Sequence, residues 1–407
     1  MTVGTTVADV YDLEGLRAQF PALSGGLAFF DGPGGSQTPS VVAERISEVM
    51  LAGLSNRDRG TPTGRRADDI VGLAREAMGD LLGADAGTVV FGRSMTALTY
   101  DLARTLARQW TPGEEVVVTS LDHDANVRPW VQAARASGCA VRWAHFDPAS
   151  GELPPQAVTE AITGRTRVVA LTAASNVLGT RPELAQVIGA AREVGALVVI
   201  DAVHLAPHAP VDLAGWDADV VLCSPYKFFG PHLGVLAGRA PLLESLRPDK
   251  LLPAPDRVPE RFELGTLPYE LLAGTLAAVE LIAGLDPGGA GTRRQRLLAS
   301  YRELEDHEQT LLRRLEAGLD TIDGLVRYSR AAHRTPTSYF ALAHRASAEV
   351  SAVCARAGIN APAGHFYALE ASRRLGLGDT GAVRAGMAPY TTEAEVDRLL
   401  EAVAQAA

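Results

Sequence analysis

Two apolar runs near the middle of the chain each end in a residue that can do chemistry. Residues 198–239 read VVIDAVHLAPHAPVDLAGWDADVVLCSPYKFFGPHLGVLAGR. The first run ends at Asp201, and the second is followed by Ser224, Tyr226 and Lys227. Runs of this kind, apolar on both faces, are typical of strands buried between two layers of helices. Because ligands bind at the carboxyl ends of parallel strands, we expect Asp201 and Lys227 to meet at that edge of a sheet.

The same alternation of short apolar runs and helical segments extends on both sides of this stretch. We expect strands at residues 88–91, 115–119, 141–145, 167–172, 196–201, 220–223 and 234–237. Residues 182–195 have apolar side chains three and four positions apart, which predicts a helix with Pro182 in its first turn and Gly195 at its end. The alternation predicts an α/β fold with a mostly parallel seven-stranded sheet between helices.

A Gly- and Pro-rich stretch at residues 284–291 predicts a domain boundary. We assign residues 26–284 to a large α/β domain, residues 285–407 to a small C-terminal α+β domain, and residues 1–25 to an N-terminal segment that joins the small domain. The small domain is expected to contain a long helix at 293–317 that Gly318 ends, strands near 338–342 and 382–386, a helix near 348–357 and a last helix after Thr392. Thr392 and Glu395 have the spacing of a capping box.

Composition and charge exclude several classes of protein. The 407 residues are 47% hydrophobic and 21% charged, which suits a large buried core and excludes disorder. The net charge is −10 and the basic residues are scattered, so we expect no nucleic acid and no membrane as partner. No export signal or membrane span is visible, and Cys139, Cys223 and Cys354 lack the spacing of a metal site or a disulfide framework. A cytoplasmic protein without a metal site is the expectation.

Asp201 and Lys227 together fit the requirements of pyridoxal phosphate. A lysine amine forms the Schiff base with this cofactor, and a carboxylate keeps the pyridine nitrogen protonated so that the ring accepts electrons. Taken singly, a lysine after a strand is more often a surface residue, and an aspartate there is more often a helix cap. The run of Ser224, Tyr226 and Lys227 before Gly230 is more specific, and pyridoxal 5'-phosphate is therefore the predicted cofactor.

With these residues in place, the sequence resembles the cysteine-desulfurase-like group of the class V aminotransferase family, which has the PLP fold type I. The resemblance implies that the cofactor phosphate lies at a helix start formed by Ser94, Met95 and Thr96, although a serine there is also an ordinary helix cap. It further implies that His123 stacks on the pyridine ring. The other implied cofactor contacts are Asn176, Asp201, His204, Ser224, Tyr226, Lys227 and Thr266.

The same resemblance implies how a small amino-acid substrate is bound. Residues 30–39 look like the family's segment at the substrate entrance, and Arg384 matches the arginine that clamps the α-carboxylate. Asn176 and His365 complete the predicted substrate-binding residues, and Lys227, His123 and Asp201 are the predicted catalytic ones. Tyr367 and Trp130 are further candidates for the pocket wall, with core packing as the alternative for both. By resemblance the active unit is a homodimer in which the Gly265-Thr266 loop reaches the neighbouring site.

The match to desulfurases fails at the sulfur-accepting cysteine. These enzymes carry a mobile cysteine shortly before the arginine strand, whereas residues 358–367 here read GINAPAGHFY. Cys354 comes too early, inside an expected amphipathic helix, and Cys223 would point to the opposite face of its strand from Ser224. The sequence therefore favours a PLP-dependent lyase that cleaves a C–S or related Cβ–X bond of a cysteine-derived amino acid by β-elimination.

Three alternatives remain open. The first is an aminotransferase, a decarboxylating deaminase or an epimerase, because fold type I enzymes differ in which substrate bond is broken and not in the cofactor. The second is a true cysteine desulfurase that uses Cys354. The third is a non-catalytic PLP-binding protein. The sequence does not reveal the substrate beyond its α-amino acid head.

Overall fold

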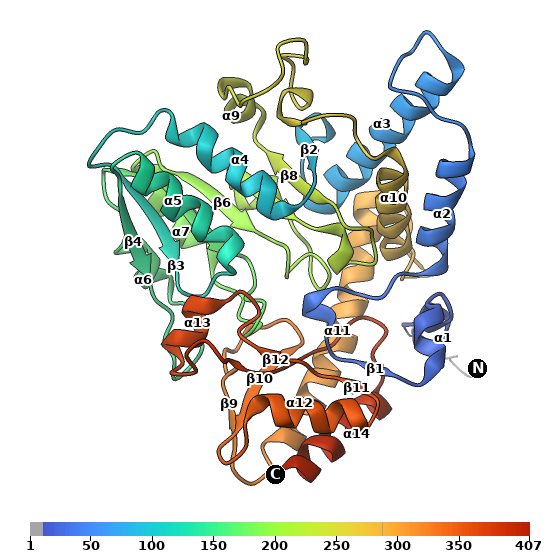
Figure 1. The fold of residues 1–407 in the computed structure, drawn as a ribbon, viewed down its shortest axis with the longest axis vertical. Coiled ribbons are helices and arrows are strands. Elements are labelled where there is room, and N and C mark those ends of the chain that lie inside the picture. Colours follow the sequence, from blue (N-terminus) through green and yellow to red (C-terminus); the bar gives the residue numbers. More distant parts are fainter. Residues whose placement is uncertain (1–10, 287) are drawn as a thin grey trace, which may run out of the picture.

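The computed structural model describes residues 11–286 and 288–407, and a seven-stranded sheet lies at its centre (Figure 1). The strands are β2 (Val89–Gly92), β3 (Glu115–Thr119), β4 (Ala140–Ala144), β5 (Thr166–Thr172), β6 (Leu197–Asp201), β7 (Val220–Cys223) and β8 (Gly234–Gly238). Their order is β2-β8-β7-β6-β5-β3-β4, and β8 alone runs antiparallel to its two neighbours. All seven predicted strands and the mostly parallel sheet are confirmed.

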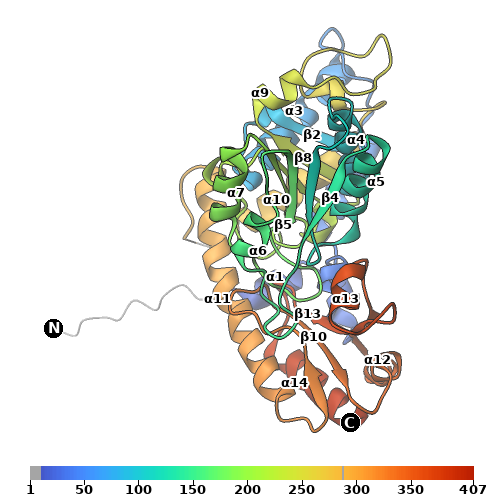
Figure 2. The same cartoon turned by 90° about the vertical axis from the view of Figure 1, so that its left-hand side faces the viewer.

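Helices cover both faces of this sheet, as Figure 2 shows edge-on. One face packs against α4 (Met95–Ala107) and α5 (Arg128–Ala136), and the other against α3 (Pro62–Leu82), α7 (Leu184–Glu193) and α10 (Tyr269–Ala283). Successive residues of β3 enter opposite cores, since Val116 and Val118 belong to the first layer and Val117 to the second. The remaining helices of this part are α1 (Leu13–Ala18), α2 (Ser40–Leu51), α6 (Pro155–Thr159), α8 (Leu213–Trp216) and α9 (Ala240–Ser245).

The helix predicted at residues 182–195 forms, but its start differs from the prediction. α7 begins at Leu184, and the side chain of Glu183 caps it by accepting a hydrogen bond from the Ala185 amide. Pro182 therefore lies before the helix and not in its first turn. Gly195 follows the helix with a φ of 72°, which is the left-handed conformation that favours glycine at a helix end.

A four-stranded antiparallel sheet lies in the C-terminal part. Its order is β12 (Ala363–Gly364), β13 (Ala382–Gly386), β10 (Thr337–Leu342) and β9 (Leu325–Arg327). The helices there are α11 (Arg293–Leu319), α12 (Ser347–Arg356), α13 (Leu369–Arg374) and α14 (Glu393–Ala406). The capping box of Thr392 and Glu395 at the start of α14 is present as predicted.

Gly318 does not end its helix, which corrects the prediction. α11 continues to Leu319, and Gly318 lies in its last turn. A Cβ atom at Gly318 would lie 2.3 Å from Cδ1 of Leu400 in α14. The glycine therefore allows α11 and α14 to approach closely, and only the tertiary packing explains it.

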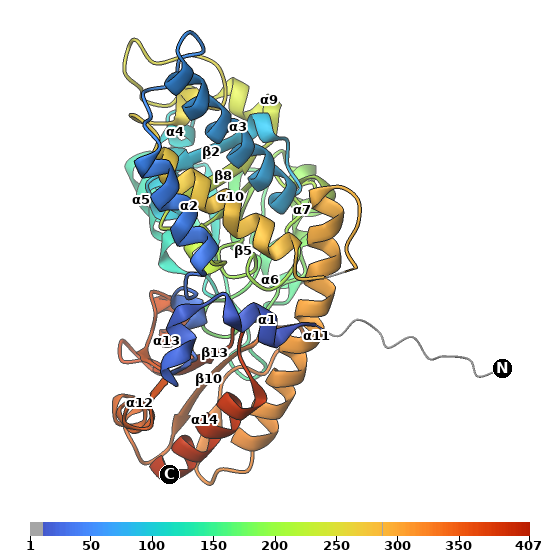
Figure 3. The ribbon, with the colours of Figure 1, turned by 90° about the vertical axis from the view of Figure 1, so that its right-hand side faces the viewer.

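The long helix α11 belongs to both halves of the molecule (Figure 3). Its Leu297 and Tyr301 pack in a core of the large sheet. Leu311 and Leu315 pack in the core of the C-terminal part, beside α14. The core of the C-terminal part also contains Phe30, which follows β1 (Ala28–Phe29). β1 pairs with β11 (Ile359–Asn360). The domain division at residues 284 and 285 stays a prediction. Of the helices in the described residues, none is long and apolar enough to cross a bilayer.

Candidate active site

A cavity of about 640 Å³ lies at the carboxyl ends of β5, β6 and β7. It brings together most of the site residues that the sequence predicts. Those that line it are Met95, Thr96, His123, Asn176, Asp201, His204, Ser224, Tyr226, Lys227 and Arg384. Pro33 and Gly34, from the segment expected at the substrate entrance, line it as well. Their placement is consistent with the predicted roles, which remain predictions.

Lys227 and Asp201 lie in a buried setting, and the charge of each affects the pKa of the other. Asp201 is the last residue of β6, and its Oδ1 accepts a hydrogen bond of 2.9 Å from the Val203 amide. Burial raises the pKa of Asp201 to about 6, against the effect of the Lys227 charge. Burial lowers the pKa of Lys227 to about 7, and the Arg384 charge lowers it further. An amine with so low a pKa is partly unprotonated at neutral pH and can act as a nucleophile or base.

His123 presents a neutral imidazole ring to the cavity. Burial, assisted by the Lys227 charge, lowers its pKa to about 4. Its Nδ1 accepts a hydrogen bond of 3.1 Å from the Ala125 amide, which assigns the proton to Nε2. Behind it, Asp122 accepts hydrogen bonds from Thr119 and Asn126, and burial raises the pKa of Asp122 to about 8. An uncharged ring is suited to stack on another aromatic ring.

The start of α4 borders the cavity and is suited to bind an anion. Helix N-termini attract anions because their first amides are unpaired. Met95 and Thr96 line the cavity, whereas the Oγ of Ser94 caps the helix by accepting a hydrogen bond of 3.1 Å from the Ala97 amide. On β8, Gly234 gives this turn its room, since a Cβ there would lie 2.1 Å from the carbonyl carbon of Ser94.

Three side chains in the cavity, those of Asn176, His204 and Arg384, have buried polar atoms without a partner among the described residues. Asn176 donates from Nδ2 to the Phe366 carbonyl at 2.9 Å, but its Oδ1 is unpaired. His204 has its Nε2 within 3.1 Å of the Thr335 and Thr337 hydroxyls, and its Nδ1 is unpaired. If a hydroxyl donates to Nε2, Nδ1 carries the proton and is free to donate. Buried polar atoms are rarely left unpaired, so these atoms are suited to a bound ligand.

Arg384 is buried and has no carboxylate partner within residues 11–286 and 288–407. It lies in β13, its Nη1 donates to the Asn176 carbonyl at 3.0 Å, and its Nε has no partner among the described residues. The guanidinium carbon lies 3.8 Å above the centre of the Phe366 ring. Burial lowers the pKa of Arg384 to about 9, which still leaves it charged at neutral pH. A buried guanidinium of this kind is ready to bind a carboxylate.

These groups fit pyridoxal phosphate. The start of α4 and Ser224 suit the phosphate, Asp201 suits the pyridine nitrogen, and Lys227 suits the aldehyde carbon. The unpaired atoms of Asn176 and His204 suit the ring oxygen.

Three predicted site residues do not line this cavity. Ser94 is occupied as the helix cap, and His365 accepts a hydrogen bond from the Tyr367 amide on its Nδ1. Thr266 lies beside a second cavity of about 1070 Å³. Trp130 is completely buried in the core and donates to Asn126, so the prediction that it forms a pocket wall is wrong.

Sequence reasoning missed several residues of the cavity. Tyr100 stands one helical turn after Thr96 on α4, a spacing that places both on one face and could have been used to find it. Arg128 lines the mouth and is paired with Asp124 and Glu370. Phe366 has no sequence signal, because only the folded chain brings it onto Arg384.

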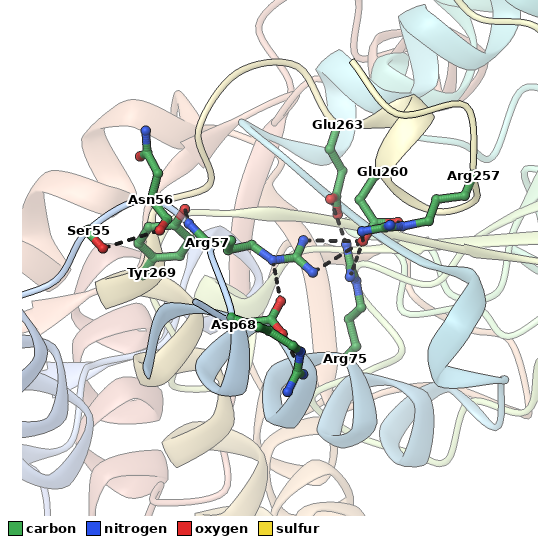
Figure 4. Close-up of polar contacts among 10 residues, drawn as sticks. Ser55, Asn56, Arg57, Asp68, Arg75, Arg257, Glu260, Glu263 and Tyr269 are labelled. Atoms are coloured by element: carbon green, nitrogen blue, oxygen red, sulfur yellow. Dashed lines mark hydrogen bonds and ion pairs between the residues drawn. The ribbon is translucent and has the colours of Figure 1, made fainter. Parts of the chain in front are cut away.

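The second cavity is bordered by a network of arginines and carboxylates (Figure 4). Arg75 pairs with Glu263 at 2.7 Å and with Glu260 at 3.2 Å. Arg57 links Asp68 at 2.8 Å to Glu260 at 3.3 Å. The network anchors the start of the segment that carries Gly265 and Thr266.

Comparisons with known proteins show which sequences and structures this chain is similar to. A family model described as aminotransferase class-V matches residues 28–399. An uncharacterized protein of Mycobacterium tuberculosis is 34% identical, over 97% of this chain and 99% of its own length. The probable cysteine desulfurase 2 of Mycobacterium leprae is 30% identical, over 100% of this chain and 98% of its own. The cysteine desulfurase CsdA of Escherichia coli has a similar structure, with a TM-score of 0.86 and 29% identity over 98% of this chain and 99% of its own.

A further solved structure shares the fold. It is a C-DES mutant with glycine covalently linked to its PLP cofactor, and its TM-score is 0.78 at 19% identity, over 95% of this chain and 98% of its own.

Proposed function

This chain belongs to the class V aminotransferase family, and from that membership we propose that it is a PLP-dependent lyase. The proposed reaction is β-elimination, which cleaves a C–S or related Cβ–X bond of a cysteine-derived amino acid. The observation that carries the proposal is that Lys227, Asp201 and Arg384 share one cavity, while none of the three cysteines of the chain lines it.

When bound, pyridoxal phosphate supplies an electron sink for the bonds at the substrate Cα. Arg384 binds the α-carboxylate and so orients the substrate. Lys227 takes the proton from Cα at its Nζ, for which its lowered pKa of about 7 is suited. Asp201 holds a proton at the pyridine nitrogen, and the uncharged His123 covers the ring and excludes water.

The positions of the thiols favour elimination over sulfur transfer to the protein. Cys354 is buried in α12, and burial raises its pKa. Cys223 faces the core of the large sheet and its pKa is strongly raised by burial, whereas the adjacent Ser224 lines the cavity. A thiol with a raised pKa is a poor sulfur acceptor, because the thiolate is the nucleophile. In the proposed reaction the sulfur leaves on a small molecule.

A true cysteine desulfurase is the second candidate, and the similarity to proteins named cysteine desulfurase favours it. That reaction needs a protein thiol to accept the sulfur, and Cys354 is the one nearest in sequence to the Arg384 strand. The Cys354→Ala variant distinguishes the two candidates, since only a desulfurase that uses this thiol loses turnover.

The experiment is incubation of the purified holoenzyme with cysteine, cysteine sulfinate and several S-substituted cysteines. Mass spectrometry identifies the products, while the cofactor spectrum reports binding. Pyruvate together with a free thiol supports β-elimination. Alanine together with protein-bound sulfur supports the desulfurase, and absence of turnover across the panel rejects both.

We also propose that the enzyme is a homodimer in which the Gly265-Thr266 loop reaches the neighbouring site. Thr266 borders the second cavity and not the site of its own chain, and Leu264 is 63% exposed. A loop that is held by buried ion pairs and borders a cavity away from its own active site is positioned to contact another subunit. Sedimentation velocity of the holoenzyme tests the dimer.

A further inference from the structure

A short segment at residues 364–367, which we name the aromatic strap, runs from the end of β12 toward α13 and borders the active-site cavity. Phe366 and Tyr367 of the strap line the cavity. Both have positive φ values, 49° and 58°, in the left-handed region that bulky residues rarely adopt. Two successive residues of this kind persist only where the surrounding contacts hold them in place.

Three of these contacts are hydrogen bonds to carbonyls of the strap. The carbonyls of Gly364, Phe366 and Tyr367 accept hydrogen bonds of 2.7, 2.9 and 2.7 Å from the Tyr339 hydroxyl, the Asn176 side chain and the Asp124 amide, respectively. Tyr339 belongs to the C-terminal sheet, whereas the other two donors belong to loops of the large sheet. The strap is therefore fixed from both sides of the cavity.

Phe366 contacts two predicted substrate-binding residues at once. Its ring lies 3.8 Å from the guanidinium carbon of Arg384, and its carbonyl accepts the Asn176 amide. The Asn176 carbonyl in turn accepts from Arg384 Nη1 at 3.0 Å. Phe366, Asn176 and Arg384 thus form a closed triangle of contacts.

The Asp31 carboxylate lines a neighbouring cavity that Arg384 also borders. Arg384 lines both the active-site cavity and a neighbouring cavity of about 400 Å³. Asp31 lines only the neighbouring cavity, and its buried Oδ1 has no partner among the described residues. No ion pair joins Asp31 to Arg384 among the described residues, yet the Arg384 charge opposes the burial that raises the pKa of Asp31. Phe366 lines only the active-site cavity.

We propose that Phe366 is a positioning residue, whose ring holds the Arg384 guanidinium toward the active-site cavity and away from Asp31, so that it stays free for a substrate carboxylate. A guanidinium is attracted to the face of an aromatic ring, and this attraction is larger when the pair is buried. That the ligand is the α-carboxylate of an amino acid rests on the proposed function. The orientation of the Arg384 guanidinium does not, because it is present before any carboxylate binds.

The experiment measures carboxylate binding separately from turnover. The holoenzyme is titrated with L-alanine, which has an α-carboxylate but no leaving group on Cβ, and the visible absorption of the cofactor reports binding. Ethylamine, which is alanine without the carboxylate, is the matched control. Phe366→Leu removes the ring face and keeps an apolar side chain, and Phe366→Tyr keeps the ring.

We expect Phe366→Leu to weaken alanine binding by about tenfold and to leave ethylamine binding unchanged, because only the contact between Arg384 and a carboxylate is lost. Phe366→Tyr is expected to bind alanine like the wild type. Adding Asp31→Asn to Phe366→Leu is expected to restore much of the binding, because the competing carboxylate is then gone. With a substrate on which the enzyme is active, we expect Phe366→Leu to raise KM by a larger factor than it lowers kcat.

The inference is overturned if Phe366→Leu binds alanine as the wild type does, or if it loses alanine and ethylamine binding equally. Thermal unfolding shows whether Phe366→Leu is folded. If Phe366→Leu does not fold, Phe366→Met is used instead, because its flexible apolar side chain also lacks a ring. If Asp31→Asn restores nothing, the competition by Asp31 is refuted. A wild type that binds alanine but turns over no cysteine derivative rejects the proposed lyase reaction and leaves this inference standing.

Discussion

Glu263 joins the second cavity to the cofactor end of the active site, and its removal is expected to destabilise the fold. The side chain is 8% exposed, and its Oε2 accepts from Arg75 at 2.7 Å (Figure 4). Its Oε1 accepts a hydrogen bond of 3.0 Å from the Phe91 amide in β2. Because β2 leads directly into the turn before α4, Glu263 also supports the predicted phosphate site.

The magnitude follows from the two contacts. Glu263→Ala removes a charged hydrogen bond, which contributes about 1.5–3 kcal/mol, and leaves the Phe91 amide unpaired, which costs about 1–3 kcal/mol. Removing one partner of a buried ion pair typically costs about 3–5 kcal/mol. Arg75 keeps Glu260 at 3.2 Å, so we expect a loss of about 3 kcal/mol, at the lower end of that range. Glu263→Gln retains an acceptor for the Phe91 amide and is expected to lose less.

The assay is guanidinium-induced unfolding of the holoenzyme at one fixed cofactor concentration, because bound cofactor itself adds stability. Glu305→Ala is the matched control. Glu305 pairs with Arg181 at 2.6 Å, but both side chains are about a third exposed, so its loss should cost less than about 1 kcal/mol. If Glu263→Ala lies within about 1 kcal/mol of Glu305→Ala, the buried network does not stabilise the fold as argued. Glu263→Ala should also release cofactor more readily on dialysis.

Three further predictions concern the active site. Lys227→Ala is expected to abolish the cofactor's visible absorption band and to lower turnover by roughly 10²–10⁴-fold or more, and a variant that keeps both would remove Lys227 from its role. Cys354→Ser should leave the turnover of cysteine derivatives unchanged, as a product assay can show, because the buried thiol takes no part in the proposed reaction. Asp122 has a pKa of about 8 in the folded protein, above that of the unfolded chain, so its contribution to stability is lost as the pH rises from about 4 to about 8. The Asp122→Asn variant of the cofactor-free protein should therefore show a smaller fall in unfolding free energy over this range, and an unchanged pH profile would show that Asp122 is ionised in the folded state.

Much of the fold could be predicted from local sequence patterns. The β-branched runs of the large sheet are apolar on both faces, a pattern that only strands buried between helices require. Asp201 ends one such run and Lys227 follows another, so the sequence predicts that they meet, because the carboxyl ends of parallel strands share one edge. The capping box at Thr392 is also predictable from the sequence, because its contacts lie within four residues.

Other features depend on contacts between distant parts of the chain. A serine at the position of Ser94, before a helix, can be a phosphate ligand or a helix cap. Its observed hydrogen bond is that of the cap. Gly318 has the sequence of a helix end, but the close approach of Leu400, 82 positions later, accounts for it. Local pattern cannot distinguish such alternatives, because both satisfy the same backbone preferences.

The sequence by itself determined the large sheet, its edge and the Lys227–Asp201 pair, because these follow from the periodicity of apolar residues and from the chemistry of residues at strand ends. Only the tertiary structure decided what surrounds Arg384. Phe366 reaches it from a strap whose two left-handed residues no local preference favours, and Asn176 reaches it from a loop of the large sheet. Such conformations form only where contacts from several elements together outweigh their cost, and those contacts exist only in the folded chain.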